Sequence, residues 1–431
     1  MWGLAVDTAA NGVQAGHAII DLLAVTGNLD VPGSVTLSKP ESFMGKWRHD
    51  CFSLIPKELH DRRVVEDRYQ GFKANMTAPH PDSVFNCLQT GMPYQFRMAW
   101  FFGTNPLANT TYAEPKRWFE ALNKMEFNVV QDIFMTPTAM GLCDLFLPLA
   151  TTAEHDGVVL PHFGRNTHFL GAMSKAVEVG DCKSDIEILI WLGKRLSPEN
   201  WPWNTAAEFF TDQVKPKLGF SFEELQEQVV YQQKFEYRKY EKGLLRDDGE
   251  PGFDTPTGLI ELKSSLYKRW GEDNLPYFQE PYYSPYNEEH PEWKEEYPFV
   301  LTTGGRSIAM FHSEHRQIPS LRAINPDPIV QINPEAAAKY GIKEGDWVAI
   351  ENELGRAVER AHLTETIDPR VVHCQHGWWF PEQEGEAPNL FGVWKSSVNS
   401  MIPNNRIGKL GYGANYKSVN CRIYKVDSLD D

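Results

Sequence analysis

The chain has 431 residues, of which 42% are hydrophobic and 23% charged, and a formal net charge of −16 from 42 basic and 58 acidic side chains. This length favours two or three domains, and the composition is typical of a globular protein and not of a disordered one. The acidic balance argues against broad nucleic-acid binding, which needs a basic surface, but it leaves room for a nucleotide cofactor held by a few local donors.

Residues 1–148 alternate helical and strand patterns. Apolar residues recur at helical spacing in 11–28, and 97–106 is typical of a buried strand that ends in a glycine–asparagine–proline turn. A helix is expected over 114–125, with a proline in its first turn, and 127–148 indicates a strand, a polar turn, a helix and a second strand. This order predicts an α/β fold with a parallel sheet.

The middle range, 149–290, is predicted to be an α+β segment that ends in a linker. Its clearest helical pattern covers 184–196. A stretch rich in Glu, Gln and Lys over 223–252 indicates a solvated helix and loop. The Pro- and Tyr-rich residues 274–293 indicate an extended segment that wraps on a surface.

Residues 291–431 are predicted to be mainly β-structure. Strands are expected over 297–305 and 370–379, and 344–365 indicates a strand pair around a glycine turn. A short helix is expected over 333–342, with an asparagine N-cap, a proline in its first turn and a glycine stop. Short strands, tight turns and one helix favour a small closed barrel.

Polar residues follow the predicted strands of the first region. Gly103 and Asn105 come after one strand, Asp132 ends the next, and Thr136 stands just behind it. Open α/β sheets bind anionic ligands at the carboxyl ends of their strands, and an aspartate there can accept hydrogen bonds from a ribose or a guanine. The alternative is that Asn105 and Asp132 only cap turns, and Asp144, before the last strand, has the same ordinary explanation.

The last region holds a second polar cluster. Two glycines after a strand, such as Gly304 and its neighbour, let the backbone approach a bulky ligand closely. Donor-rich side chains follow, and an aromatic HGWW stretch adds a pocket wall. The candidate residues of this cluster are Thr303, Gly304, Arg306, His312, Ser313, Arg316, Gln317, His376, Gly377 and Trp378.

Three hypotheses account for this cluster: a zinc site, a solvated polar turn, or a site for a large polar anion. Zinc needs three or four convergent ligands, yet no cysteine stands nearby and HExxH is absent. The six cysteines of the chain are scattered without a CxxC pair, so they form neither a disulfide framework nor a zinc or iron–sulfur motif. The donors favour the anion.

The quoted motifs also carry a family resemblance that covers most of the chain. The chain resembles molybdopterin oxidoreductases related to dimethyl sulfoxide reductase, and most of all the branch of thiosulfate and polysulfide reductases, acetylene hydratase and catechol dehydroxylases. The stretches that occur there in the same order are NGVQAGHAIIDLLAVTGNLDVPG, FFGTNP, VVQDIFMTPTAMGLCDLFLPLATTAEHDG, TPTGLIEL, LTTGGR, HSEHRQIPSLR, GDWVAIENELGR and HGWWFPE.

The resemblance implies a bis-molybdopterin guanine dinucleotide cofactor with Mo or W and a double-psi-like C-terminal barrel over 291–431. By position, Gly103, Asn105, Asp132, Thr136 and Asp144 would hold one guanosine diphosphate arm. The barrel-side residues would hold the pterin, and Asn404, Tyr416 and Lys417 are further candidates. No residue of the chain is expected to bind the metal directly.

The resemblance also implies parts that this chain does not show. The family carries a 4Fe-4S cysteine cluster and a Ser, Cys or selenocysteine metal ligand in an N-terminal half, so the chain is expected to be a C-terminal half. The expected partners are that half, in the same protein or in a separate chain, an iron–sulfur electron-transfer subunit and a small-molecule substrate. The alternative is a cofactor-binding fragment that is inactive alone. No apolar run reaches the roughly 18 residues of a membrane helix, no leader is evident, and localisation stays open between the cytoplasm and export in a folded complex.

Overall fold

The structure is a computed structural model that describes residues 6–37, 55–60, 62–110, 115–159 and 169–431. The chain forms two compact units, each built from separate stretches of sequence. The first unit contains His17–Arg63 and Leu147–Leu275, and the second contains Trp2–Gly16, Val64–Phe146 and Pro276–Asp431. The predicted boundaries after residues 148 and 290 stay predictions.

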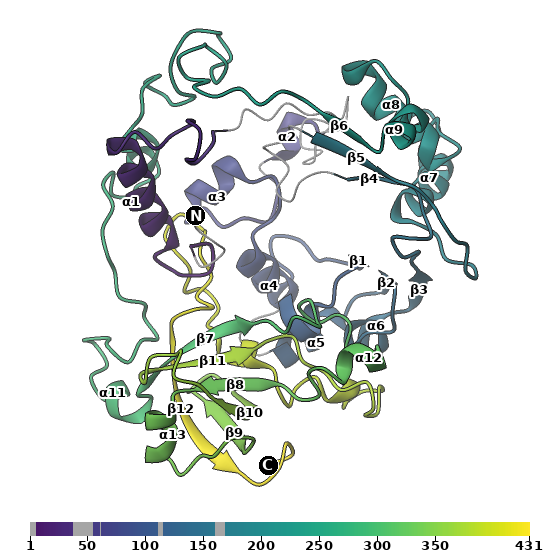
Figure 1. The fold of residues 1–431 in the computed structure, drawn as a ribbon. Helices are drawn as coiled ribbons and strands as arrows, with labels where there is room; N and C mark the ends of the chain where they lie inside the picture. Colours follow the sequence, from purple (N-terminus) through teal and green to yellow (C-terminus); the bar gives the residue numbers. More distant parts are fainter. Residues whose placement is uncertain (1–5, 38–54, 61, 111–114, 160–168) are drawn as a thin grey trace. The chain divides into compact units, whose positions relative to one another are not determined.

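A three-stranded sheet of order β1-β2-β3 organises the α/β part of the second unit (Figure 1). Strands β1 (Met98–Phe102) and β2 (Phe127–Asp132) pair in parallel, as predicted, so their carboxyl ends lie at the same edge. Strand β3 (Leu145–Pro148) completes the sheet. Helix α5 (Pro115–Leu122) is amphipathic and begins at its proline, where the missing N–H costs nothing.

The other helices of this part are short. They are α3 (Gln70–Asn75), α4 (Pro81–Thr90), the π-helix η2 (Pro106–Thr110) and α6 (Pro137–Leu142). The Phe85 ring of α4 stacks on the Trp118 ring of α5, with centroids 4.6 Å apart. This contact joins the two helices in an apolar cluster that also contains Leu107 and Leu142.

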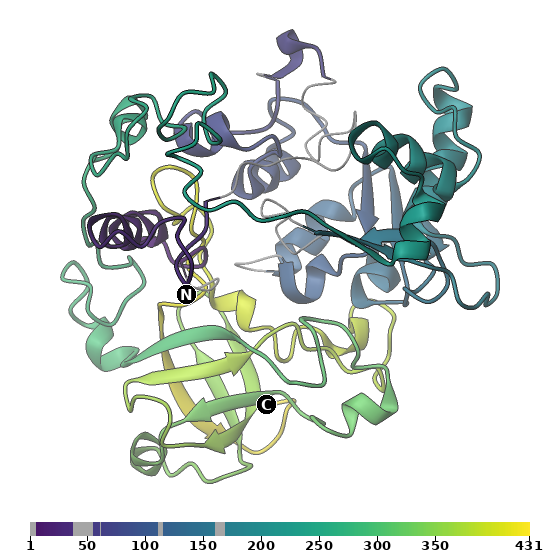
Figure 2. The ribbon, with the colours of Figure 1, turned by 45° about the horizontal axis from the view of Figure 1, so that its top comes forward.

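Six strands of the second unit close into a barrel of order β10-β8-β11-β7-β12-β9, whose strands curve around a common interior in Figure 2. The pairs β8–β10 and β7–β11 are parallel and the other four pairs are antiparallel. The predicted parallel sheet and the predicted closed C-terminal barrel are confirmed. The strands are β7 (Phe299–Gly305), β8 (Ile329–Ile332), β9 (Trp347–Glu351), β10 (Arg356–Leu363), β11 (Val371–Gln375) and β12 (Val419–Val426).

Inward-facing aliphatic residues fill the barrel. Leu301, Val330, Ile350 and Val372 are fully buried and belong to one cluster. The predicted short helix is α13 (Pro334–Lys339), and its N-cap Asn333 accepts a hydrogen bond from a backbone N–H in the first turn. Strands β8 and β12 were not predicted from the sequence. The small helices around the barrel are α11 (Trp293–Glu296), α12 (Pro319–Arg322), η3 (Leu390–Gly392) and η4 (Val398–Met401).

The first unit is built on an antiparallel sheet of order β4-β5-β6. Its buried face packs against helices through Leu170, Val214, Phe222 and Leu225. Ser184 and the glutamate at the third helical position form a capping box at the start of the predicted helix α7. The elements are β4 (Gly157–Val159), β5 (Phe169–Met173), β6 (Val230–Gln232), α2 (Lys57–His60), α7 (Asp185–Leu196), α8 (Ala206–Leu218), α9 (Phe222–Gln228) and α10 (Ser265–Arg269).

A buried ion pair joins distant segments of the first unit. Asp30 Oδ1 lies 2.6 Å from Lys239 Nζ, and the Asp30 side chain is fully buried. The same carboxylate accepts the backbone N–H groups of Lys239 at 2.7 Å and Leu37 at 3.0 Å. Asp30 adopts a left-handed backbone conformation with φ 54°. The loop that follows helix α1 (Gly12–Val25) is therefore fixed by one acidic side chain.

Within the described ranges, no helix combines the length and the apolar character needed to cross a membrane.

Candidate functional site

Three predicted residues, Gly103, Asn105 and Asp132, lie at the carboxyl edge of the sheet. Gly103 N–H donates to Gln131 O at 2.7 Å, which places the turn after β1 beside the end of β2. Asn105 is buried, and its Oδ1 accepts the Thr138 hydroxyl at 2.7 Å. Asp132 is also buried, and burial raises the pKa of its carboxyl although two backbone N–H groups donate to Oδ1.

The other two predicted residues of this region serve local structure. Thr136 is the N-cap of α6, because its hydroxyl accepts the Ala139 N–H at 3.3 Å, and it lies near the same edge as Asp132. Asp144 Oδ2 accepts the N–H of Asn128 at 2.7 Å, at the beginning of β2. The structure therefore places Asp144 at the opposite end of the strand from Asp132 and does not bring the two together.

The barrel-side cluster centres on two histidines that are 64 positions apart in the sequence. His312 Nδ1 lies 2.7 Å from His376 Nε2, and Arg306 Nη2 lies 3.2 Å from His312 Nε2. Burial, then the charges of Arg306 and Arg316, lower the pKa of His312. Burial, then His312 and Arg316, lower the pKa of His376 to about 3. Both rings are therefore neutral at physiological pH.

Arg316 is the most buried cation of this cluster, with 3% of its surface exposed. Its guanidinium donates to the backbone oxygens of His376 at 3.1 Å and Glu314 at 3.2 Å, and it stacks 4.7 Å from the centre of the Trp378 ring. Burial, then the charge of Arg322, lower the pKa of Arg316 to about 9. Arg322 lies 4.9 Å from the same indole. Arg322 was not singled out from the sequence, although it ends the quoted HSEHRQIPSLR stretch.

Backbone conformations in the cluster allow close approach. Gly304 and Gly377 have positive φ values of 87° and 69°. A Cβ on Gly377 would stand 3.1 Å from the backbone of His312, so a side chain at this position would crowd the two segments. His312 and His315 also have positive φ, at 47° and 74°. Such strain in residues that are not glycine is typical of functional sites.

Three further predicted residues frame the cluster. The Thr303 hydroxyl donates to Tyr416 O at 2.9 Å, and Lys417 Nζ donates to Thr303 O. Ser313 is buried and its carbonyl accepts the indole N–H of Trp379 at 2.7 Å. Burial, then Arg306, lower the pKa of Lys417. Two cations, Arg306 and Arg316, line one small hollow beside Gly305 and Trp378.

The edge of the sheet and the barrel cluster lie close together. The negative charge of Glu314, in the HSEHR stretch, is among the influences that raise the pKa of Asp132. Both residues belong to the second unit. Trp379, whose indole donates to Ser313 O, lies in one apolar cluster with Leu107 and Leu142, so the barrel side and the sheet side of the site pack against each other.

Comparisons with known proteins identify the fold family. The family description "Molybdopterin oxidoreductase" matches residues 1–195, and "Molydopterin dinucleotide binding domain" matches residues 299–419. The chain belongs to the molybdopterin oxidoreductases. The matched ranges include both halves of the site described above.

Individual molybdopterin oxidoreductases are similar along nearly the whole chain. Dopamine dehydroxylase of Eggerthella lenta is 27% identical over 98% of this chain and 48% of its own length. Acetylene hydratase of Syntrophotalea acetylenica is 28% identical over 89% of this chain and 54% of its own length. The chain thus spans about half the length of these relatives. The solved acetylene hydratase of Pelobacter acetylenicus shares the fold, with a TM-score of 0.85 at 24% identity over 99% of this chain and 60% of the other.

Several buried polar atoms of the candidate site have no hydrogen-bond partner among the residues that the structure describes. Such atoms are rare in folded proteins and each needs an explanation. Among the candidate residues they are Asn105 Nδ2, Arg316 Nε, Gln317 Oε1, His376 Nδ1 and Asn404 Oδ1. A pterin dinucleotide offers donors, ring acceptors and phosphate oxygens, so it can pair with both the unpaired donors and the unpaired acceptors. The residues present therefore fit the molybdopterin cofactor of the family.

The side chains that usually bind metal ions are not clustered in the described part of the chain. In the described stretches, no group of three or more His, Cys, Asp or Glu side chains is arranged to hold a metal ion. The described cysteines, at 87, 143, 182, 374 and 421, are all free thiols. The histidine cluster of the barrel side is paired with arginine and lysine, and these cations disfavour a zinc ion.

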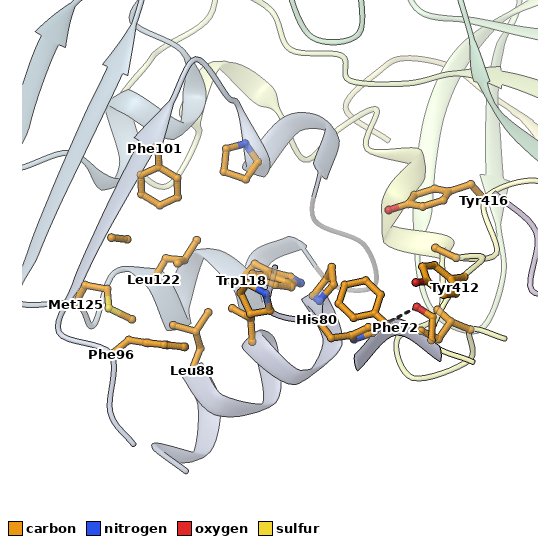
Figure 3. Close-up of a pocket in the computed structure, with 18 of the residues that line it drawn as sticks. Phe72, His80, Leu88, Phe96, Phe101, Trp118, Leu122, Met125, Tyr412 and Tyr416 are labelled. Atoms are coloured by element: carbon orange, nitrogen blue, oxygen red, sulfur yellow. Dashed lines mark hydrogen bonds between the residues drawn. The ribbon is translucent and has the colours of Figure 1, made fainter. Parts of the chain in front are cut away.

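A separate apolar cavity of about 610 Å³ lies within the second unit. Figure 3 shows Tyr416 and Tyr412 on one side and Leu122 and Met125 on the other. Burial, then Asp82, raise the pKa of Tyr416. Tyr416 thus lines the cavity while the adjacent Lys417 reaches Thr303, so the two residues of this predicted pair serve different places. The apolar walls suit an uncharged group and not a pyrophosphate.

A buried acid below the cluster was not predicted. Glu359 on β10 is fully buried, and neither carboxyl oxygen has a hydrogen-bond partner of normal geometry. Burial raises the pKa of Glu359 well above its ordinary value, and Gln375, Cys374 and Arg316 oppose this only in part. The sequence feature that could have revealed Glu359 is a single acidic residue among small and apolar neighbours on a predicted barrel strand.

We expect stability to fall with rising pH because of Glu359. Its folded-state pKa is raised, so the folded protein holds a proton that the unfolded chain loses above about pH 4.5. From there up to the raised pKa, wild-type stability falls by up to about 1.4 kcal/mol per pH unit relative to Glu359→Gln. Urea unfolding of both proteins between pH 5 and pH 8 measures the difference. Parallel curves would refute this assignment.

We also expect Asp132→Ala to weaken retention of the guanine nucleotide. Charged hydrogen bonds contribute about 1.5–3 kcal/mol, which is more than tenfold in affinity. Guanine nucleotide released by acid from the cofactor-loaded protein measures the effect. Asp144→Ala is the matched control, because Asp144 bonds the other end of β2. Equal nucleotide content in wild type and Asp132→Ala would count against a role for Asp132.

Proposed function

We propose that the second unit binds a bis-molybdopterin guanine dinucleotide with molybdenum or tungsten. The observation that carries this proposal is the group of cations around His312 and His376, of which Arg316 is almost fully buried, together with the unpaired buried polar atoms. An anionic ligand with many acceptors would compensate these charges. Asn105 and Asp132 would hold a guanosine diphosphate arm, and the barrel cluster, with Gln317, would hold the pterin side.

When bound, the cofactor supplies exchange of an oxygen atom or hydroxyl group and transfer of electrons. The residues of this chain then bind and orient it. Arg316 would contribute a charge held in place by the Trp378 ring and by two backbone oxygens. Gly304 and Gly377 would let the ligand and the His312 backbone approach closely. Asp132 would accept donors of a ribose or a guanine.

We further propose that catalysis uses polypeptide outside residues 1–431. The metal ligand and a 4Fe-4S cluster would come from an N-terminal half or a separate chain, and electrons from an iron–sulfur subunit. The relatives that support this are about twice as long as the chain, and one is named as a subunit, the F420-dependent formate dehydrogenase subunit alpha of Methanocaldococcus jannaschii. The substrate would be a small organic molecule, since the relatives' names include dopamine and acetylene. The alternative is a cofactor-binding protein without activity of its own.

Replacing His312 or Gln317 with alanine should lower pterin and metal content together while the fold survives. Each change removes one group from a buried polar network, so a loss of about 1–3 kcal/mol is expected. Metal analysis and fluorescence of the released pterin, on the protein purified with its cofactor, measure both contents.

The exposed His362 of β10, which pairs with Glu344, is the matched control for His312. If the cluster were a zinc site, His312→Ala would release zinc and leave the pterin in place. If it were a solvated turn, neither content would change. Either of these results would overturn the proposed function.

A further inference from the structure

Three side chains of the barrel cluster form a directed chain of hydrogen bonds. Arg306 Nη2 contacts His312 Nε2 at 3.2 Å, and His312 Nδ1 contacts His376 Nε2 at 2.7 Å. The segments that carry them are the loop after β7, the HSEHR stretch and the end of β11. Arginine has donors only, so it fixes the direction of every bond in the chain.

The protonation state of each ring nitrogen follows from that direction. Because Arg306 donates, His312 Nε2 must accept and carry no proton. A histidine has at least one ring N–H, so His312 Nδ1 is protonated and donates to His376 Nε2. His376 Nε2 is therefore unprotonated, and the proton of His376 is on Nδ1. Both rings are neutral, in agreement with their lowered pKa values.

The last donor of the chain has no acceptor. His376 Nδ1 is buried and has no hydrogen-bond partner in the described structure. A Cβ built on Gly304 would stand 4.0 Å from His376 Nδ1 and 2.7 Å from Lys417 Nζ. Two N–H donors, Lys417 Nζ and His376 Nδ1, therefore lie next to the bare backbone of Gly304, where a Cβ would collide with Lys417. A buried donor without an acceptor is costly, which points to a ligand atom at this place.

We propose that Arg306 and His312 are positioning residues that hold His376 in its Nδ1–H tautomer, and that His376 Nδ1 and Lys417 Nζ together bind one acceptor atom of a ligand at Gly304. The acceptor would be an oxygen or a ring nitrogen of a planar heterocycle. The tautomer is independent of the proposed function, whereas the assignment of the acceptor to the pterin rests on it.

Burial, and after it the neighbouring ring of His312 and the surrounding cations, lower the pKa of His376 and keep this donor neutral. Arg306, Arg316 and Lys417 face it from the loop after β7, the HSEHR stretch and the segment before β12, and each of them lowers its pKa. A second proton on His376 would have to bind Nε2 and would break the bond from His312. The donor is thus available over the physiological pH range.

Nitrogen-15 NMR of the histidine rings tests the tautomer in the full chain without cofactor. The spectra of His312→Gln and His376→Gln assign the two rings. In wild type we expect His376 protonated at Nδ1 and not at Nε2, with no titration near pH 6. Arg306→Met should release the lock, so that the tautomers of both rings mix, while burial continues to keep the pKa of His376 low. Arg306→Lys restores a donor and should restore the tautomer.

Arg306 is exposed, so its replacement should not disturb folding. The ring of His373, on the same strand as Cys374 and beside Thr302, is the internal control and should not respond. Protonation of His376 at Nε2 in the wild type would contradict the proposed hydrogen-bond chain. Tautomers that stay unchanged in Arg306→Met would contradict it as well.

A second experiment tests whether a ligand atom accepts the hydrogen bond of His376 Nδ1–H. Cofactor in the loaded protein should shift the His376 Nδ1–H signal, and Arg306→Met should lose more pterin than Arg306→Lys. If His376 has the expected tautomer but its Nδ1–H signal does not shift when the cofactor is bound, the proposed ligand acceptor is wrong and the hydrogen-bond chain from Arg306 to His376 still holds. Absence of any pterin from the loaded wild-type protein would overturn the proposed function instead.

Discussion

Arg316→Met should remove most of the cofactor from the loaded protein. The guanidinium is almost completely buried among cations, and its pKa is lowered to about 9. An anionic ligand is the partner that such a group lacks. Truncating one member of a buried, hydrogen-bonded charge pair costs about 2–5 kcal/mol, which corresponds to a loss of roughly thirtyfold to several thousandfold in affinity.

The stability of the cofactor-free chain should change much less. Methionine keeps the contact with Trp378 and removes an uncompensated charge, but it leaves the backbone oxygens of Glu314 and His376 without their donor. These effects oppose each other. Pterin content of the loaded protein and urea unfolding of the empty protein separate binding from folding. Arg422→Met, at an arginine that pairs with Glu351 on the barrel surface, is the matched control. Full pterin content in Arg316→Met would contradict the assignment.

Asp30→Ala should cost about 3–5 kcal/mol of unfolding free energy, because it leaves the buried ammonium of Lys239 without its carboxylate. It also removes the acceptor of two backbone N–H groups. The positive φ of Asp30 adds strain for alanine that aspartate or asparagine tolerates better. Denaturant unfolding of the first unit measures the loss.

Lys239→Met is the informative partner variant. The carboxylate of Asp30 keeps the N–H groups of Leu37 and of residue 239, so the loss should be smaller than in Asp30→Ala. A surface pair such as Lys242 and Glu236 is the control, since exposed pairs contribute about 0–1 kcal/mol. If Asp30→Ala were no worse than breaking the surface pair, the buried pair would not hold this unit together.

The sheet edge was predictable because parallel strands share a direction. Asn105 and Asp132 both follow strands, so pairing of β1 with β2 brings them to one edge. Asp144 precedes a strand, and this position alone places it at the other edge. The family resemblance predicted that Asp144 binds the same guanosine diphosphate arm as Asp132. The hydrogen bond from the Asn128 N–H instead places Asp144 at the opposite edge of the sheet.

A small β-barrel was predictable from the sequence, but two of the strands that close it were not. Strand β8 has only four residues, and β12 forms its pairs with segments more than 70 positions away, so local patterns do not reveal either. Helix α8 was missed because Pro216 stands inside it and weakens the helical pattern.

Geometry inside the site could not come from the sequence. The motifs placed His312 and His376 in one cluster, but their direct contact depends on the positive φ values of His312 and Gly377. The stack of Arg322 on Trp378 and the burial of Glu359 likewise depend on tertiary packing. The domain boundaries and the individual ligand roles stay predictions.

The most direct test of the account is the content of the protein itself. The chain should be purified without oxygen from its native host, together with the polypeptide that accompanies it, and treated with acid. Mass spectrometry then counts pterin, guanine nucleotide, molybdenum, tungsten and zinc. The account predicts pterin and guanine nucleotide in equal amounts, with molybdenum or tungsten at half that amount and zinc absent. Protein that contains stoichiometric zinc, with neither pterin nor guanine nucleotide, would contradict it.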